Sequence, residues 1–110
     1  MARVKSKTLK FTPSASADVT EYLVYFEPAA DPTKLSYEST VASIGKPAPG
    51  ADGKIAVDMS QFEIIRTLDG KYDIGLTSVD DGGNESSMAM LLAVELDFTA
   101  PDAPTGLELV

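Results

Sequence analysis

The chain of 110 residues contains no cysteine, no histidine and no tryptophan. The absence of cysteine excludes disulfides and thiol chemistry, and the absence of both cysteine and histidine excludes the usual zinc sites. Without histidine, every catalytic triad that depends on an imidazole base is excluded as well. The fold must therefore be stabilised by packing alone, which a single domain of this length can supply.

Long apolar runs and a leader-like amino terminus are also missing. No apolar stretch approaches the length of a membrane span, and the chain does not open on a charged segment followed by an apolar one. Because a leader can be removed on maturation, the missing leader-like segment does not indicate in which cellular compartment the protein is found. Carboxylate pairs and Ser–Lys pairs remain as catalytic options, but the acids are scattered over turns and outward strand positions. We therefore predict no membrane insertion and no enzymatic activity.

Charge is unevenly distributed along the chain. The net charge is −8, yet the first ten residues contain Arg3, Lys5, Lys7 and Lys10 and no acid. An acidic body repels nucleic acid and anionic lipid, so neither is predicted as a partner. The basic end is typical of a solvated tail or of charges that protect an edge strand.

Most of the chain has the pattern of short strands separated by turns. Apolar and polar residues alternate over 8–12, 20–27, 35–44, 55–59, 72–79 and 88–98, and the apolar residues from Met88 to Phe98 fall in one phase. Ser60 and Glu63 have the spacing of a capping box, which predicts a short helical turn over 61–68 that closes at Gly70. The pattern favours an all-β, two-sheet antiparallel β-sandwich.

Several of these segments resemble the fibronectin type III family. Leu9–Phe11 is similar to the second strand of the family, Tyr22–Phe26 to the third, and Leu68–Val79, with Tyr72 as the corner tyrosine, to the sixth. The 80–86 turn resembles the Asp-x-x-Gly-Asn-Glu-Ser turn of bacterial members. Phe11 stands where a core tryptophan is usual, and the helical insertion is longer than the usual connection.

The resemblance implies an immunoglobulin-like domain over 1–98 with a non-catalytic role. That role is a spacer or cell-adhesion module, in tandem repeats of a larger bacterial protein that is secreted or on the cell surface. The expected partner is therefore another protein, such as a neighbouring repeat or a copy of the same chain.

The two ends depart from the family pattern. The first strand is missing before Thr8, and 99–110 is similar to an inter-repeat linker followed by a first strand that includes Leu107, Leu109 and Val110. Residues 97–105 reach about 28 Å at most, comparable with the length of a sandwich, so a return within the chain would be taut. One interpretation is a self-assembling subunit in which 107–110 pairs with the second-strand edge of a neighbouring copy. The other is a frayed tail.

Two groups of residues are candidate sites. Leu23 and Tyr25 lie on the face opposite to Tyr22, Val24 and Phe26, where they form either a contact surface or a patch covered by the chain's own loops. The other group carries oxygen ligands that suit calcium, although the spacing is not that of an EF-hand and Asp and Asn also favour turns. No cofactor is predicted, and a calcium-binding inter-repeat module is the alternative. The calcium candidates are Asp80, Asp81, Asn84, Glu85, Asp97 and Asp102.

Overall fold

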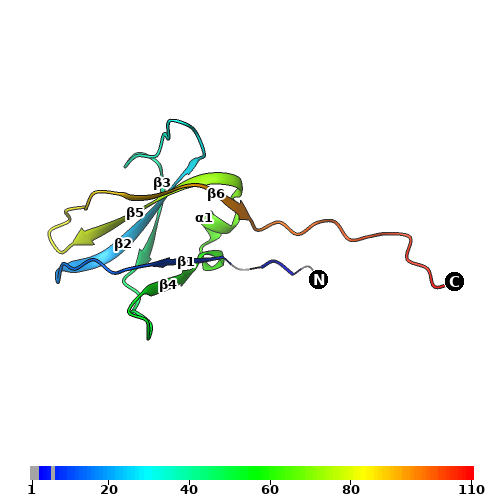
Figure 1. The fold of residues 1–110 in the computed structure, drawn as a ribbon, viewed down its shortest axis with the longest axis horizontal. Coiled ribbons are helices and arrows are strands. Elements are labelled where there is room, and N and C mark those ends of the chain that lie inside the picture. Colours follow the sequence, from blue (N-terminus) through cyan, green and yellow to red (C-terminus); the bar gives the residue numbers. More distant parts are fainter. Residues whose placement is uncertain (1–2, 6) are drawn as a thin grey trace.

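Two antiparallel sheets face each other in the computed structural model, which describes residues 3–5 and 7–110 (Figure 1). The smaller sheet pairs β1 (Thr8–Phe11) with β4 (Ile55–Asp58). The larger sheet has the order β3-β2-β5-β6, formed by β3 (Thr40–Gly45), β2 (Val19–Pro28), β5 (Asp69–Asp80) and β6 (Ala89–Asp97). This confirms the predicted all-β, two-sheet sandwich. Met1, Ala2 and Ser6, which belong to the predicted domain 1–98, lie outside the described residues.

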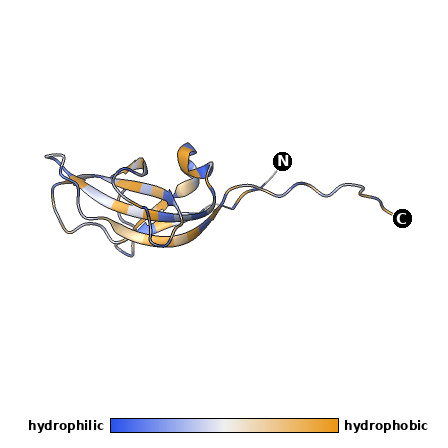
Figure 2. Cartoon of the chain, turned by 90° about the horizontal axis from the view of Figure 1, so that it is seen from above, coloured by the Kyte–Doolittle hydropathy of each residue, from blue (hydrophilic) through white to orange (hydrophobic). Residues whose placement is uncertain are grey.

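One apolar core fills the space between the sheets. Val24 and Phe26 of β2 and Ile55 of β4 are almost completely buried, because alternate residues of each strand point inward. Figure 2 shows apolar and polar segments alternating along the strands. The ring of Phe11 meets that of Tyr22 edge-on, with centroids 5.0 Å apart. The predicted inward faces of the first, second and fourth strands are therefore confirmed.

The helical connection is formed differently from the prediction. A 3₁₀ turn, η1 (Met59–Gln61), begins after Asp58, whose carboxylate accepts both the amide of Ser60 at 2.9 Å and its hydroxyl at 2.6 Å. A four-residue helix, α1 (Glu63–Arg66), follows without a side-chain cap. The predicted capping box is wrong, because the Ser60 amide donates to the Asp58 carboxylate and not to the side chain of Glu63. Gly70 is not a helix cap either, since it lies within β5.

β3 is shorter than predicted. It begins at Thr40, and 35–39 forms a turn in which the Ser39 amide donates to the carbonyl of Ser36 at 3.1 Å. Leu35 is buried on the outer face of the larger sheet, away from the main core. The apolar residues at 35 and 37 mimic a strand pattern, but they belong to this covering turn.

A bulge divides β6 into two halves. The β5–β6 register shifts between Tyr72 and Ile74, and Ala93 has a φ of 55°. Beyond the bulge Val94 and Leu96 pack into the core, whereas Met88 lies against Gly75 on the outer face. The predicted single phase from Met88 to Phe98 is therefore wrong, because one extra residue exchanges the two faces of a strand.

Candidate interaction surface

The outer face of the larger sheet is covered by the chain itself at Tyr25. This side chain is 3% exposed, and its ring meets that of Tyr37 edge-on at 6.0 Å. Its hydroxyl donates to the Glu85 carboxylate, which also accepts the Thr77 hydroxyl at 2.6 Å. Burial, followed by the hydrogen bond to Glu85, raises the pKa of Tyr25 to about 12. Internal cover is thus what the structure shows for Tyr25, while Leu23 is half-buried beside Thr77 and Ser43.

A buried carboxylate on the same face was missed in the sequence. Asp73 is 1% exposed and accepts the Thr33 hydroxyl at 2.5 Å, the Ala93 amide at 2.9 Å and the Ala30 amide at 3.4 Å. The bond from Thr33, followed by that from Ala93, lowers the pKa of Asp73 below its usual range. The available signal in the sequence was that Asp73 lies within the predicted strand 72–79 and not in a turn. Its role is structural, because it joins the 29–33 loop to the β6 bulge.

The calcium candidates do not converge on one centre. Asp80 and Asn84 lie in one turn with Glu85 and line a cavity of about 180 Å³, but Asp97 is at the far end of β6. Asp80 accepts the Gly82 and Asn84 amides and the Asn84 side-chain amide, and the bonds from Asn84 lower its pKa most. Asp81 and Asp102 are exposed. Within the described ranges, no group of three or more acidic, His or Cys side chains is placed to hold a metal.

The sandwich is open along the edge formed by β1 and β6. β1 pairs with β4 on one side and, among the described residues, with no strand on the other. Two hollows of about 260 and 220 Å³ lie between β1 and β6, and both are lined by Leu9, Ile74 and Leu91. Leu91 remains 54% exposed, and Met90, which lines one of the two hollows, is 49% exposed. We call this apolar feature the β1–β6 groove. Leu92 is 52% exposed but borders a separate cavity beside Asp73.

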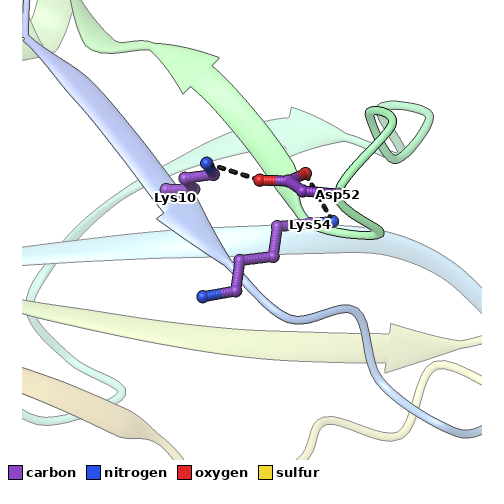
Figure 3. Close-up of polar contacts among 3 residues, drawn as sticks. All are labelled: Lys10, Asp52 and Lys54. Atoms are coloured by element: carbon purple, nitrogen blue, oxygen red, sulfur yellow. Dashed lines mark hydrogen bonds and ion pairs between the residues drawn. The ribbon is translucent and has the colours of Figure 1, made fainter.

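Basic residues accompany β1 at this open edge. The Lys10 ammonium lies 2.5 Å from the Asp52 carboxylate, which also accepts the Lys54 amide at 3.0 Å (Figure 3). The ion pair, together with the Lys54 amide, lowers the pKa of Asp52. About half of each side chain of the pair is exposed. Arg3 and Lys5 are exposed in the segment that leads into β1.

The tail 99–110 leaves the sandwich as an extended segment without secondary structure. It departs from the end of β6 that lies beside the start of β1 (Figure 1). Leu107 and Leu109 are 98% and 103% exposed, and Val110 is exposed as well. The residues predicted to form a spare strand are therefore unpaired in the single chain.

Comparisons with protein-family models, with curated proteins and with solved structures found no match. In the part of the chain that the structure describes, no helix is long and apolar enough to cross a membrane. The functional conclusion therefore depends on the surface of the chain itself.

Proposed function

We propose that this chain is a non-catalytic protein–protein interaction module of the fibronectin type III kind. It would serve as a spacer or adhesion repeat of a larger bacterial protein that is secreted or on the cell surface. The observation that carries the proposal is the β1–β6 groove, an open apolar edge lined from both sheets by Leu9, Ile74 and Leu91.

The pairing of the strands supports the kinship. In immunoglobulin-like sandwiches the second and fifth strands share one sheet, and the third, sixth and seventh share the other. If β1 is the second strand of that scheme, β4 takes the place of the fifth, and β2, β5 and β6 take those of the third, sixth and seventh. The first strand of the scheme would lie beside β1, where the groove is open.

The composition of β6 supports a role in binding. Edge strands of soluble proteins are usually protected by charges, prolines or covering loops. β6 instead exposes Met90, Leu91 and Leu92 in succession. About half of each of these side chains is still exposed, so a partner that covers one gains at most about half of the roughly 1.5–3 kcal/mol that full burial gives.

Site-specific photocross-linking in cells of the organism whose genome encodes the chain tests the proposal. A photoreactive side chain at Leu91 should give a protein adduct, identified by mass spectrometry, because position 91 lies in the groove. The matched control is the same group at Asp81, an exposed residue of the 80–84 turn, outside the groove. The proposal is wrong if position 91 gives no adduct, or the same adducts as position 81.

A further inference from the structure

We infer that the β1–β6 groove binds residues 107–110 of a second copy of this chain, which add an antiparallel strand to the free side of β1. The inference rests on the proposed interaction function and deepens it, because it names the partner and the segment that docks. Four features carry it: the unpaired backbone, the side-chain pattern, the charges and the direction of the tail.

The backbone of β1 offers hydrogen bonds on its open side. The Met59 amide donates to the Lys7 carbonyl at 2.7 Å, so the ladder with β4 uses the backbone groups of Lys7, Leu9 and Phe11. In an antiparallel ladder the intervening residues point the other way. The N–H and C=O groups of Thr8 and Lys10 therefore face the groove side, where an added strand can pair with them.

The tail has the side-chain alternation that this edge requires. Leu9 and Phe11 pack against the core beside the groove, whereas Thr8 and Lys10 are exposed. Residues 107 and 109 share one strand face, and residues 108 and 110 share the other.

These phases exclude registers that are shifted by one residue, and the pairing of Glu108 with Lys10 selects one of the antiparallel registers that remain. Glu108 is opposite Lys10, which places Leu107 opposite Phe11, Leu109 opposite Leu9 and Val110 opposite Thr8. A slip by one residue would turn the carboxylate of Glu108 into the apolar groove, so this register is favoured over its neighbours.

The charges of the two segments are complementary. The segment 99–110 carries Asp102 and Glu108 and no basic residue, whereas the first ten residues are basic. The Lys10 ammonium has three N–H donors, so it can keep its ion pair with Asp52 and also donate to the carboxylate of Glu108 (Figure 3). Opposite charges directly across two strands stabilise the pair.

The direction of the tail favours a second copy over the same chain. Lys7, at the start of β1, lies beside Leu96 near the end of β6, so the two strands run in opposite directions. A strand antiparallel to β1 must run back toward that same end. The chain's own tail would therefore have to pass along β1 and reverse within Thr99–Gly106, which contains Pro101 and Pro104. A second copy meets no such constraint, and reciprocal or successive docking gives dimers or chains.

Mass in solution, measured by light scattering over a concentration series, is the first test. The unaltered chain should form dimers or larger species, and L107D/L109D should associate at least tenfold more weakly. Both leucines are fully exposed in the single chain, so the substitutions leave its thermal unfolding unchanged. The matched control A100D/A103D adds the same charge to the linker and should associate like the unaltered chain.

A mixing experiment tests the geometry. L91D alters the groove and leaves the tail intact, whereas L107D/L109D alters the tail and leaves the groove intact. Each variant alone should be monomeric. Their mixture should form 1:1 dimers and nothing larger, because it contains one functional tail and one functional groove per pair. Folding of L91D is checked by its unfolding temperature.

Amide hydrogen exchange then reports the register. On association the amides of Thr8, Lys10, Glu108 and Val110 should become protected, whereas that of Leu109, which points away from β1, should stay unprotected. A chain that stays monomeric at all concentrations overturns the inference, as does association that survives L107D/L109D. A monomer with a protected tail overturns it too, in favour of pairing within the chain. If position 91 still cross-links to a different protein, the interaction function stands and only the second copy is wrong.

Discussion

The carboxylate of Asp73 accepts the backbone amide of Ala93 at 2.9 Å, and this bond joins β5 to the bulge of β6. Ala93 is the one non-glycine residue with a positive φ in the part of the chain that the structure describes. The bulge sets which residues of β6 face the core and which lie at the surface. A single buried acid on the adjacent strand is thus hydrogen-bonded to the bulge that follows the exposed apolar segment.

Replacing Ala93 by glycine should cost little or stabilise the fold. An L-residue in the left-handed region costs roughly 1–2 kcal/mol, and glycine removes that cost while losing roughly 0.5–1 kcal/mol of its own backbone freedom. The matched control A89G lies on the same strand, where φ is not positive. It should destabilise by about 0.5–1 kcal/mol. Urea unfolding compares the two, and equal destabilisation would show that the bulge does not strain Ala93.

The Asp73 carboxylate should make stability depend on pH in acid. Its pKa is lower in the folded chain than in the unfolded one, so its contribution is fully present above about pH 4. That contribution is lost as the pH falls further, through the folded pKa. D73N should unfold more easily at pH 7 and lose less stability than the unaltered chain between pH 5 and pH 2.5. D69N, at an exposed position of the same strand, is the control. A D73N curve parallel to that of the unaltered chain would contradict the assignment.

The periodicity of the sequence was sufficient to predict the two-sheet core. It predicted the inward faces of 8–11, 22–26 and 55–59, because period-2 alternation directly encodes one buried strand face. It failed where a single residue changed the local geometry. One extra residue in β6 forms a bulge at which Asp73 accepts the Ala93 amide. The Asp58 carboxylate accepts the Ser60 amide, which in a capping box would donate to Glu63.

The outer face was harder to predict than the inner one. Tyr25 alternates out of the core and so had the pattern of a surface residue, but Tyr37 and Glu85, which are distant in sequence, cover it. Leu107 and Leu109 were recognised as strand-like from their alternation. The sequence left two alternatives for them, pairing with the second-strand edge of a neighbouring copy or a frayed tail. The groove beside β1 could not be derived from the sequence, because it forms only when the two sheets are assembled.

Tyr25 should titrate later than an ordinary tyrosine. Its raised pKa, about 12, means that the folded chain holds the phenolic proton while the unfolded chain, with an ordinary pKa near 10, releases it. The stabilisation from this group is therefore complete below pH 10 and is lost as the pH rises toward 12. Ultraviolet absorbance should show a late-titrating tyrosine signal that Y25F removes and Y37F retains. Y25F should also destabilise by about 0.5–1.5 kcal/mol through the lost hydrogen bond.

Calcium should not stabilise the fold. The oxygens of Asp80 already accept two backbone amides and the Asn84 side chain, and Oε2 of Glu85 accepts two hydroxyls. Among the described residues no group of three or more acids is placed to hold a metal, so millimolar calcium should leave the unfolding temperature unchanged. D80N should lower that temperature equally with and without calcium. A rise with calcium that D80N abolishes would instead establish a site in this turn.

Gly75 should resist replacement, because two side chains occupy the space that a Cβ would need. A Cβ there would overlap the sulfur of Met88, lie 2.7 Å from its Cγ and 3.2 Å from Cδ2 of Leu35. Overpacking costs roughly 1–3 kcal/mol in a core, and Met88 is flexible and half-buried, so G75A should lower the free energy of unfolding by about 1 kcal/mol, the lower end of that range. If the overlap with Met88 is the cause, G75A/M88A should be more stable than the sum of the two single substitutions predicts. Additivity of the two changes would show that the outer cover is loose, and that Tyr25 is not held under a packed layer.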